Sequence, residues 1–502
     1  MPLLYSFSND WIAILAFVVL IFFVIGLAEF AKKTLKWKNE FSRKLVHVLV
    51  GVLLTLSPFF VKDAFPIFLL GVFFVIANYA SLKQEAFKGM NTNDRMSYGT
   101  VYFPIAFVIL VIVFWERNPT IFLTSMLVLA FADTAASIVG EKFKSKVFVL
   151  YQDKKSVYGS LAYFFVALII IIIFYPFFTR LDKNGLELPL LAIFSVGVIA
   201  AFISTIAEAV SSKGSDNLTL TISTAIMLDL GFTFWSNGEF HILLFWIFAS
   251  FVLAATAYKL KSLNAGGFAG AFIMGSIMFA IGGFDTFLPL LAFFVLSSLL
   301  SKIKDRYYKN DDSISKKGSN RDVSQVYANA GWSLLFIIAY HFSPDTLWYI
   351  LFLASLAAAT ADTWESEIGQ FSRKNPIHIF NFKRVEKGTS GAISFLGSFG
   401  GIVGAIIIAF IGYHSGIDIT LKHVILISMG GFIGSVIDSV VGATIQSKFK
   451  CAKCQKDTEK HIHCELPTYH SSGIPYIDND IVNYICTGSS AIFVGLFILL
   501  TN

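Results

Sequence analysis

Long runs of apolar residues recur along the chain and are separated by short polar segments. The clearest runs approach the roughly 20 residues that a helix needs to cross a bilayer; they are residues 11–27, 161–178, 190–207, 242–257 and 393–411. A porin-like barrel would instead show alternating segments of about ten residues, a pattern that this sequence lacks. We therefore predict an all-α fold, a polytopic integral membrane helical bundle with about sixteen transmembrane helices.

The composition agrees with a protein whose main solvent is lipid. The 502 residues are 56% hydrophobic and 14% charged, and the mean hydropathy is +0.70. Such a chain is too apolar for the surface of a soluble domain. Lysines follow the first apolar run and no basic segment precedes it, so we expect an uncleaved first span with its amino end outside.

Positive charge is concentrated in every second loop, as the positive-inside rule requires of cytoplasmic loops. The basic loops are residues 32–44, 83–95, 142–155, 302–321, 373–387 and 448–460. The net charge of +6 thus follows from membrane topology, although a basic inner face would also suit phosphorylated ligands or anionic lipid. We predict a multi-pass protein, in the cell inner membrane if the source is bacterial, with active sites facing the cytoplasm and no nucleic-acid partner.

The chain contains an internal duplication. Segment 132–140 returns as 361–369 with the shared pattern Ala-Asp-Thr-x-x-Ser-x-x-Gly. Glu208 follows Asp133 by 75 residues, and Asp438 follows Asp362 by 76. We predict two parallel repeats, residues 1–238 and 239–502, of about eight helices each, because an even number of helices gives both halves the same orientation.

Asp133 and Asp362 stand in the repeated motif, near the cytoplasmic ends of their predicted helices. A single carboxylate at that depth could serve in helix packing or reach the membrane interface. Its recurrence with the same neighbours favours a functional role, since intramembrane ionisable residues usually act on a substrate or an ion. The two aspartates are therefore candidate catalytic residues.

A motif with a lysine and a hydroxyl follows each aspartate and is predicted to open the next helix. It is Lys155-Ser156-x-x-Gly159 in the first half and Lys387-Gly388-Thr389-x-Gly391 in the second. An ammonium, a hydroxyl and backbone N–H groups at a helix N-terminus can hold phosphate, which makes Lys155 and Lys387 candidate catalytic residues. The alternative is a membrane-flanking lysine beside a hydroxyl cap, and neither segment is a Walker A loop.

Further carboxylates in both halves offer hard oxygen ligands for Mg²⁺ beside the predicted phosphate sites. They are Glu208, Asp216, Asp438, Asp478 and Asp480. Some of them could instead cap helices, because Asp-Asn before Leu218 or Ile481 is also a good helix start.

Three of the four cysteines lie in one predicted cytoplasmic loop, residues 446–478, so a disulfide framework is not expected. Cys451, Cys454, His463 and Cys464 could make a tetrahedral Zn²⁺ site, with His461 also nearby in the sequence. The adjacency of His463 and Cys464 departs from the usual ligand spacing. Free loop thiols are the alternative.

The first half, residues 1 to about 238, resembles the CTP-dependent polyprenol kinases, the group of phytol kinase and dolichol kinase. The matching motifs are Arg43-Lys44-x-x-His47, Arg95-x-Ser97-Tyr98-Gly99, Asp133-Thr134-x-Ala136-x-x-x-Gly140, Lys155-Ser156-x-x-Gly159-Ser160 and Glu208 with Asp216-Asn217. Tyr158 and Lys144 depart from the family pattern, which more often has a glutamate and a glycine there. Taken alone, His47 would be a polar residue satisfied at the membrane interface.

The second half, residues 239 to 502, resembles the transmembrane protein 19 family, which includes plant phytyl-phosphate kinase. The match extends over nearly the whole half. Its main motifs are Arg321-x-x-x-Gln325-Val326-x-x-Asn329, Ala361-Asp362-Thr363-Trp364-x-Ser366-Glu367-Ile368-Gly369, Gly388-Thr389-x-Gly391, Gly434-Ser435-x-x-Asp438 and Asp478-Asn479-Asp480.

Together the resemblances imply a bifunctional membrane isoprenoid kinase that uses Mg²⁺ and, as phosphoryl donor, CTP. The first half would phosphorylate an isoprenoid alcohol, and the second would convert the monophosphate to the diphosphate. The nucleotide and phosphates would be bound by Arg43, Lys44, His47 and Arg95 in the first half, and by Arg321, Gln325 and Asn329 in the second. A cytidylyltransferase making a CDP-lipid and a secondary transporter in the lipid bilayer are the alternatives.

Overall fold

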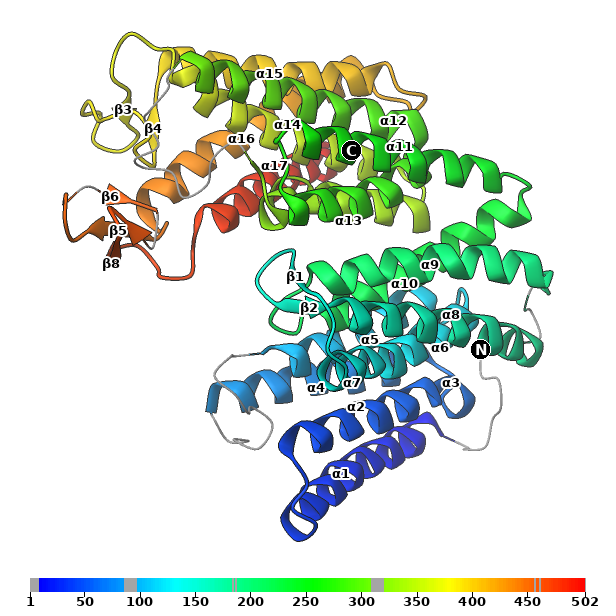
Figure 1. Ribbon diagram of the computed structural model, residues 1–502. Coiled ribbons are helices and arrows are strands. Elements are labelled where there is room, and N and C mark those ends of the chain that lie inside the picture. Colours follow the sequence, from blue (N-terminus) through cyan, green and yellow to red (C-terminus); the bar gives the residue numbers. More distant parts are fainter. Residues whose placement is uncertain are drawn as a thin grey trace. The chain divides into compact units, whose positions relative to one another are not determined.

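The computed structural model describes residues 9–84, 97–182, 185, 187–307, 320–455, 457–459 and 462–501 (Figure 1). Its chain forms two compact units, Met1–Leu244 and Phe245–Asn502. Each unit has a helical core of its own.

Thirteen of the described helices are long and apolar enough to cross a membrane, which confirms the predicted polytopic helical membrane fold. α5 (Gly99–Phe114) is apolar but has only 16 residues. α12 (Ala265–Tyr307) has 43 residues and is broken at Gly283, where φ is +53°. The total of about sixteen spans, set by the length a bilayer requires, and the two eight-helix repeats stay predictions.

The first unit begins with α1 (Asp10–Thr34), α2 (Asn39–Thr55), the short α3 (Ser57–Phe60), α4 (Ala64–Gln84) and α5. A helix in three parts follows, namely α6 (Pro119–Leu127), the π-helical turn η1 (Val128–Ala132) and α7 (Asp133–Lys142). The hairpin of β1 (Val147–Val149) and β2 (Lys154–Ser156) leads to α8 (Val157–Leu181), α9 (Leu190–Val210) and α10 (Asp216–Ser236).

The helix made of α6, η1 and α7 lies in the core of the first unit. Its most apolar window is 67% buried, against 22% for α1 and for α4, which leave more of their surface to lipid. Asn118 caps α6 by accepting a hydrogen bond from the backbone N–H of Ile121 (3.2 Å), and Pro119 at the first turn is preset for a helix. Asp133 is the first residue after η1.

The second unit contains α11 (Phe240–Lys259), which begins before the unit boundary, and then α12, α13 (Val323–Phe342) and α14 (Thr346–Gly369). The short strands β3 (Ile377–His378) and β4 (Ala392–Ile393) precede α15 (Phe395–Tyr413) and α16 (Leu421–Thr444). The last helix is α17 (Asn479–Thr501).

α14 is the core helix of the second unit, and its most apolar window is 72% buried. Asp345 caps it by accepting from the backbone N–H of Leu347 (2.8 Å). Every residue from Tyr349 to Ala361 is buried. Asp362 therefore follows directly after the buried centre of its unit, as Asp133 does in the first unit.

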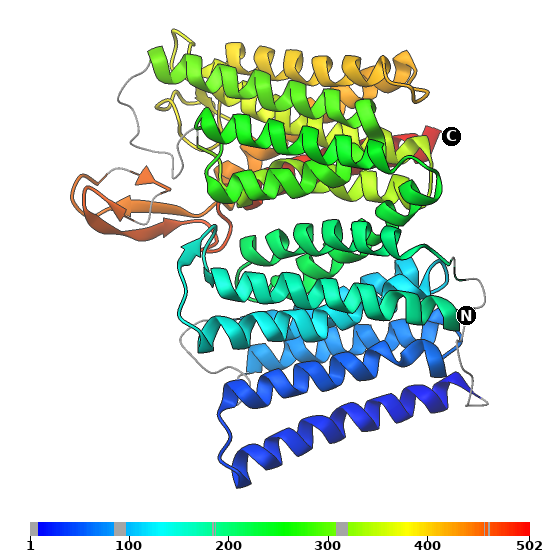
Figure 2. The same ribbon diagram turned by 45° about the vertical axis from the view of Figure 1, so that its right-hand side comes forward.

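The predicted cytoplasmic loop 446–478 is largely a small sheet that projects beyond the helix ends (Figure 2). Its strands are β5 (Lys448–Cys451), β6 (Asp457–Thr458), β7 (Ile462–His463) and β8 (Leu466–Ser472), in the order β6-β5-β8-β7. Ser447 donates its backbone N–H to Ile477 (2.7 Å), and Ile474 donates to Ile445 (2.9 Å). These bonds close the base of the sheet on the ends of α16 and α17.

Candidate active sites

A cavity of about 1400 Å³ lies in the first unit, between α1, α2, α4, α5, α7 and α8. Its charged lining includes Arg43, Asp133, Lys155, Glu208 and Asp216. The remainder is mainly aliphatic and aromatic, including Ile21, Leu54, Leu70, Phe74 and Phe107. Arg43 and Leu54 are 11 residues apart on α2, or roughly 16 Å along its axis, so the cavity joins a charged end to an apolar depth.

Lys155, the middle residue of β2, is a largely buried cation at the charged end. Its Nζ donates to Glu208 and lies 3.4 Å from Asp216 Oδ2. Burial works against the charged form of Lys155, but the two carboxylates outweigh burial and raise the pKa of its ammonium above the usual range. Glu208 Oε2 is buried and has no hydrogen-bond partner among the described residues, so this oxygen is available to a ligand.

His47 of α2 contacts the π-helical turn that precedes Asp133, and also Asp133 itself. Its Nε2 lies 3.8 Å from Asp133 Oδ2 and 3.1 Å from the carbonyl oxygen of Leu129, within η1. A π-helical turn shifts the hydrogen-bond ladder and frees backbone groups for other partners. Gly51 permits the close approach of the two elements, because a Cβ at that position would lie 2.7 Å from Ala130 Cβ.

Arg43 and Lys44 bring two positive charges to the edge of the cavity. Lys44 Nζ pairs with Glu141 Oε2 at 2.6 Å, and Ser137 donates to Glu141 Oε1 at 2.9 Å. Arg95, the other predicted cation of this half, lies outside the described residues.

The predicted helix start at Lys155–Gly159 is confirmed. Ser156 caps α8, and its Oγ accepts from the backbone N–H of Gly159 at 3.1 Å. Gly159 also lets α8 touch α7, since a Cβ there would lie 2.9 Å from the carbonyl oxygen of Ala136 and 3.4 Å from Gly140 Cα. The phosphate-binding role of Ser156 and Gly159 stays a prediction.

Two motifs of the first half meet although they are 118 residues apart. Asn217 Nδ2 donates to the carbonyl oxygen of Gly99 at 2.9 Å, and the backbone N–H of Tyr98 donates to Lys213 at 2.8 Å. Gly214, with φ +87°, packs so closely that a Cβ would lie 2.3 Å from Gly99 N. These residues were not predicted as site residues from the sequence, although Gly99 and Asn217 belong to its motifs. The feature of the sequence that could have indicated them is that Gly99 and Asn217 each lie beside charged residues of a motif.

In the second unit, Asp362 of α14 faces Asp438 of α16. Their carboxyl groups lie within hydrogen-bonding reach of each other, and Asp438 Oδ1 receives no donor among the residues that the structure describes. Two facing carboxylates repel each other unless a proton or a cation lies between them. The pair can therefore share a proton or hold a cation.

Glu365, one turn after Asp362, is a further acidic residue that was not predicted as a candidate from the sequence. It accepts hydrogen bonds from Ser398 (2.8 Å) and Ser435. The sequence could have indicated Glu365, because it lies three residues after Asp362 and therefore on the same helix face. The first unit has Ala136 at the corresponding position.

The predicted helix start at Lys387–Gly391 is wrong. α15 begins at Phe395, and its cap is Ser394, whose Oγ accepts from the backbone N–H of Gly397 at 3.1 Å. A Cβ at Gly397 would lie 3.2 Å from Gly369 Cα of α14, which repeats the contact between α8 and α7. The structural counterpart of Ser156-x-x-Gly159 is thus Ser394-x-x-Gly397.

Lys387 instead lies in the loop between β3 and β4, and its Nζ donates to the carbonyl oxygen of Gln370 at 2.8 Å. Gln370 follows Asp362 by eight residues, roughly 12 Å along a helix. Gly388 and Gly391 have φ of +85° and +78° and shape the turns of this loop, where Thr389 donates to the carbonyl of Glu386 (2.8 Å). Their catalytic and phosphate-binding roles stay predictions.

Arg321, Gln325 and Asn329 lie together at the start of α13 and line a pocket of about 90 Å³. This volume is below the roughly 300–1,000 Å³ of typical small-molecule sites, so a nucleotide would need more room than the pocket offers. Burial lowers the pKa of Arg321, whose guanidinium lies 5.6 Å from the ring centre of Phe293. Gln325 and Asp322 form the capping box of α13.

Asp478 caps α17 by accepting from the backbone N–H of Ile481 at 3.2 Å, which confirms the helix-cap alternative for this residue. Asp480 Oδ2 lies 2.7 Å from Ser324 Oγ, which is also 2.8 Å from Asp322 Oδ1. Asp480 thus joins the start of α17 to the start of α13. Magnesium binding by Asp478 and Asp480 stays a prediction.

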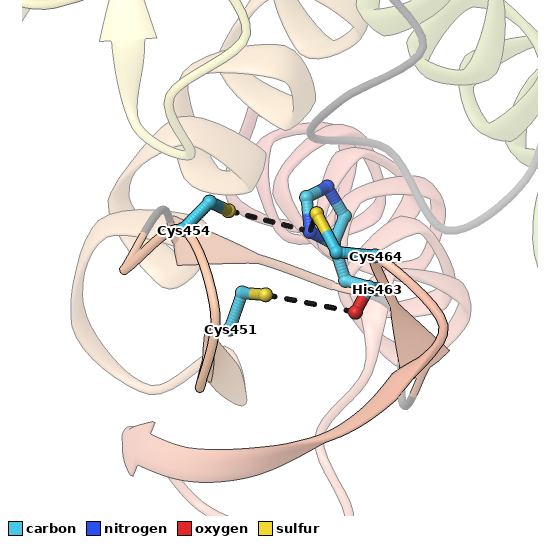
Figure 3. A group of neighbouring side chains, drawn as sticks. All are labelled: Cys451, Cys454, His463 and Cys464. Atoms are coloured by element: carbon cyan, nitrogen blue, oxygen red, sulfur yellow. Dashed lines mark hydrogen bonds between the residues drawn. The ribbon is translucent and has the colours of Figure 1, made fainter.

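Cys451, Cys454, His463 and Cys464 come together at one end of the small sheet (Figure 3). Their potential ligand atoms all lie within 4.8 Å of one another. The backbone N–H of Cys454 donates to Cys451 and, with further hydrogen bonds, lowers the pKa of the Cys451 thiol to about 6. His461 lies outside the described residues.

Comparison with known proteins identifies the family of the chain. Residues 248–491 match the family described as integral membrane protein DUF92. An uncharacterized membrane protein of Methanocaldococcus jannaschii is 37% identical over 201 residues, which cover 39% of this chain and 80% of the relative. The chain belongs to the DUF92 family of integral membrane proteins. No solved structure matches it.

Further relatives of this DUF92 protein include a plant protein and a cyanobacterial one. Protein PGR of Arabidopsis thaliana is 32% identical over 271 residues, covering 48% of this chain and 91% of the relative. A protein named phytol kinase from Synechocystis is 24% identical over 226 residues, covering 45% of this chain and 94% of the relative.

Proposed function

We propose that this DUF92 protein is a membrane isoprenoid kinase whose first unit phosphorylates an isoprenoid alcohol and whose second unit phosphorylates the resulting monophosphate. The observation that carries the proposal is the cavity of the first unit, which joins charged side chains to an apolar depth. An isoprenoid alcohol has the same division, a hydroxyl on a long apolar chain. The relative named phytol kinase supports this substrate class.

In the first unit, the substrate hydroxyl would meet a nucleoside triphosphate at the charged end of the cavity. The alcohol oxygen forms a bond to the terminal phosphorus while the bond from that phosphorus to the nucleoside diphosphate breaks. We assign Asp133 to orient the hydroxyl and accept its proton, with His47 holding the turn that carries it. Lys155, Arg43 and Lys44 would offset the charge of the phosphates, because phosphoryl transfer depends on positioning and charge neutralisation.

The carboxylates at each site fit a hard cation. Mg²⁺ is commonly held by one or two carboxylates together with substrate phosphates. Glu208, whose Oε2 has no partner among the described residues, and Asp216 would hold it in the first unit, and Asp362 with Asp438 in the second. When bound, the ion neutralises charge on the transferring phosphoryl group.

The second unit would act on the product of the first. Its facing carboxylates, with Glu365 beside them, are the groups we assign to this step. Fusion of the two units in one chain raises the effective concentration of an amphiphilic monophosphate at the second site. We place both sites at the cytoplasmic face of the membrane, where basic loops gather and nucleotide is present.

An assay with purified protein in lipid tests this function. Each labelled nucleoside triphosphate is supplied with phytol, geranylgeraniol or farnesol, or with their monophosphates. We expect CTP to be the best donor and CDP to be released, with the label moving to the lipid. Release of pyrophosphate and a CDP-lipid would instead establish a cytidylyltransferase, and nucleotide-independent counterflow in proteoliposomes would establish a transporter.

A further inference from the structure

We propose that Cys451, Cys454, His463 and Cys464 bind one Zn²⁺ ion that holds together the small sheet between α16 and α17. The proposal goes beyond the kinase function and does not depend on it. It is one of the two alternatives that the sequence leaves open for these cysteines.

The distances from His463 Nδ1 to two of the sulfur atoms match those of a tetrahedral site. His463 Nδ1 lies 3.5 Å from Cys454 Sγ and 3.3 Å from Cys464 Sγ. With Zn–S of about 2.3 Å and Zn–N of about 2.0–2.1 Å, a tetrahedron places sulfur and nitrogen about 3.6 Å apart. Figure 3 shows the four side chains turned toward one another from two turns of the chain.

The sheet topology brings these two turns together. Cys451 ends β5 and Cys454 lies in the turn toward β6, whereas His463 ends β7 and Cys464 begins the turn into β8. β5 and β8 are antiparallel neighbours, with Cys451 opposite Thr468, so the end of β5 lies beside the beginning of β8. The spacing in the sequence argues against binding of one metal ion by both His463 and Cys464, because these two residues are adjacent. Here Cys464 has φ +52°, and this backbone turn brings its sulfur back beside the His463 ring.

The Cys-x-x-Cys turn also has hydrogen bonds that suit a bound thiolate. The backbone N–H groups of Lys453 and Cys454 donate to Cys451 Sγ. Gln455, directly after the second cysteine, has φ +56° and donates its N–H to the carbonyl of Cys451 at 3.0 Å. Such bonds orient metal ligands and stabilise their charge.

The sheet has little else to stabilise it. Within the described part of 448–472, Cys451 and Thr458 are the buried residues. Of the larger apolar side chains, Ile462 (67%), Leu466 (43%) and Tyr469 (48%) are exposed, and Phe449 is half-buried. Small domains without an apolar core usually depend on disulfides or a structural metal. Because all four ligands come from the protein, the site is closed and therefore structural rather than catalytic.

The metal content of the purified full-length protein tests the proposal. The protein is prepared with a tag that contains no histidine and without chelator, and its metals are measured by elemental analysis. We expect about one zinc per chain, lost in a Cys451→Ser/Cys454→Ser variant. Cys486→Ser is the matched control, since Cys486 is a buried cysteine of α17 outside the cluster, and it should retain the zinc.

A second measurement on the wild-type chain does not depend on the folding of any variant. Exposed Cys454 and Cys464 should resist alkylation until a strong chelator is added, and limited proteolysis should then cut within residues 446–478. Metal-free wild-type protein whose exposed thiols react at once would overturn the proposal. Retention of zinc by the double variant, or iron in place of zinc, would overturn it as well.

Discussion

At the scale of residues, Lys155 sets the charge balance of the first site. Its side chain is 14% exposed and that of Glu208 is 6% exposed, so neither charge is well solvated. Removing one partner of a buried ion pair costs about 3–5 kcal/mol, because the other charge remains buried without compensation. Lys155 is therefore expected to contribute both to folding and to phosphate binding.

Comparing Lys155→Met with a Lys155→Met/Glu208→Gln variant separates these two contributions. For Lys155→Met, we expect alcohol phosphorylation to fall by at least about 100-fold, as it does when one charge-stabilising donor is lost from an active site, and the thermal unfolding midpoint to drop. A Lys155→Met/Glu208→Gln variant should recover much of the midpoint but none of the activity. Lys146→Met is the matched control, because Lys146 is an exposed lysine of the same hairpin segment. A Lys155→Met enzyme with near wild-type activity would contradict the assigned role.

The sequence predicted many of these residues but not how they pair. Motif spacing was enough to name Asp133, Lys155, Glu208 and Asp216, which the structure brings to one cavity. The pairing of Asn217 with Gly99 depends on loops that approach each other only in the folded unit. Glu365 was missed because the first unit has alanine at that position, so the comparison of the two halves drew no attention to it.

At the scale of elements, the helix that carries the aspartate packs against the next helix through glycine in both units. The contact is Gly140 with Gly159 in the first unit and Gly369 with Gly397 in the second. The sequence misplaced the second contact because the segment between α14 and α15 is longer than that between α7 and α8, so matching the lysines gave a false register. No local pattern predicted η1 either, since a π-helical turn has no apolar period of its own.

Gly397→Ala should destabilise the protein and weaken the second activity. The added Cβ would lie 2.7 Å from the carbonyl oxygen of Glu365 and 2.9 Å from Ser394 Oγ, and overpacking of this kind costs about 1–3 kcal/mol. Thermal unfolding and monophosphate phosphorylation measure the two effects. Gly26→Ala is the control, because a Cβ there meets nothing within 4 Å among the described residues. Alanine favours a helix by about 1 kcal/mol relative to glycine, and both substitutions gain this term. Gly397→Ala should therefore unfold at a lower temperature than Gly26→Ala, and an equal or higher midpoint would refute the close contact.

At the scale of the whole molecule, composition and the length of the apolar runs were sufficient to predict the fold class. A chain that is 56% hydrophobic with such runs exposes much of its surface to lipid, where a helical bundle satisfies the backbone. The number of spans was harder to predict. α12 continues through a break at Gly283 and α5 is short, and neither feature has a clear hydropathy signature. The small sheet was predicted as a loop because its strands have two to seven residues and few apolar positions.

The central claim is that the two units contain separate kinase sites, each dependent on its own aspartate. The most direct test supplies an isoprenoid alcohol and labelled nucleotide to the Asp133→Asn and Asp362→Asn enzymes and separates the lipids by thin-layer chromatography. Asp362→Asn should accumulate the monophosphate, whereas Asp133→Asn should make neither product from the alcohol and still convert added monophosphate to diphosphate. Each lost activity should fall by orders of magnitude, because the aspartate acts in the transition state. If either substitution abolishes both activities in protein that remains folded, the units share one composite site and the two-kinase account is wrong.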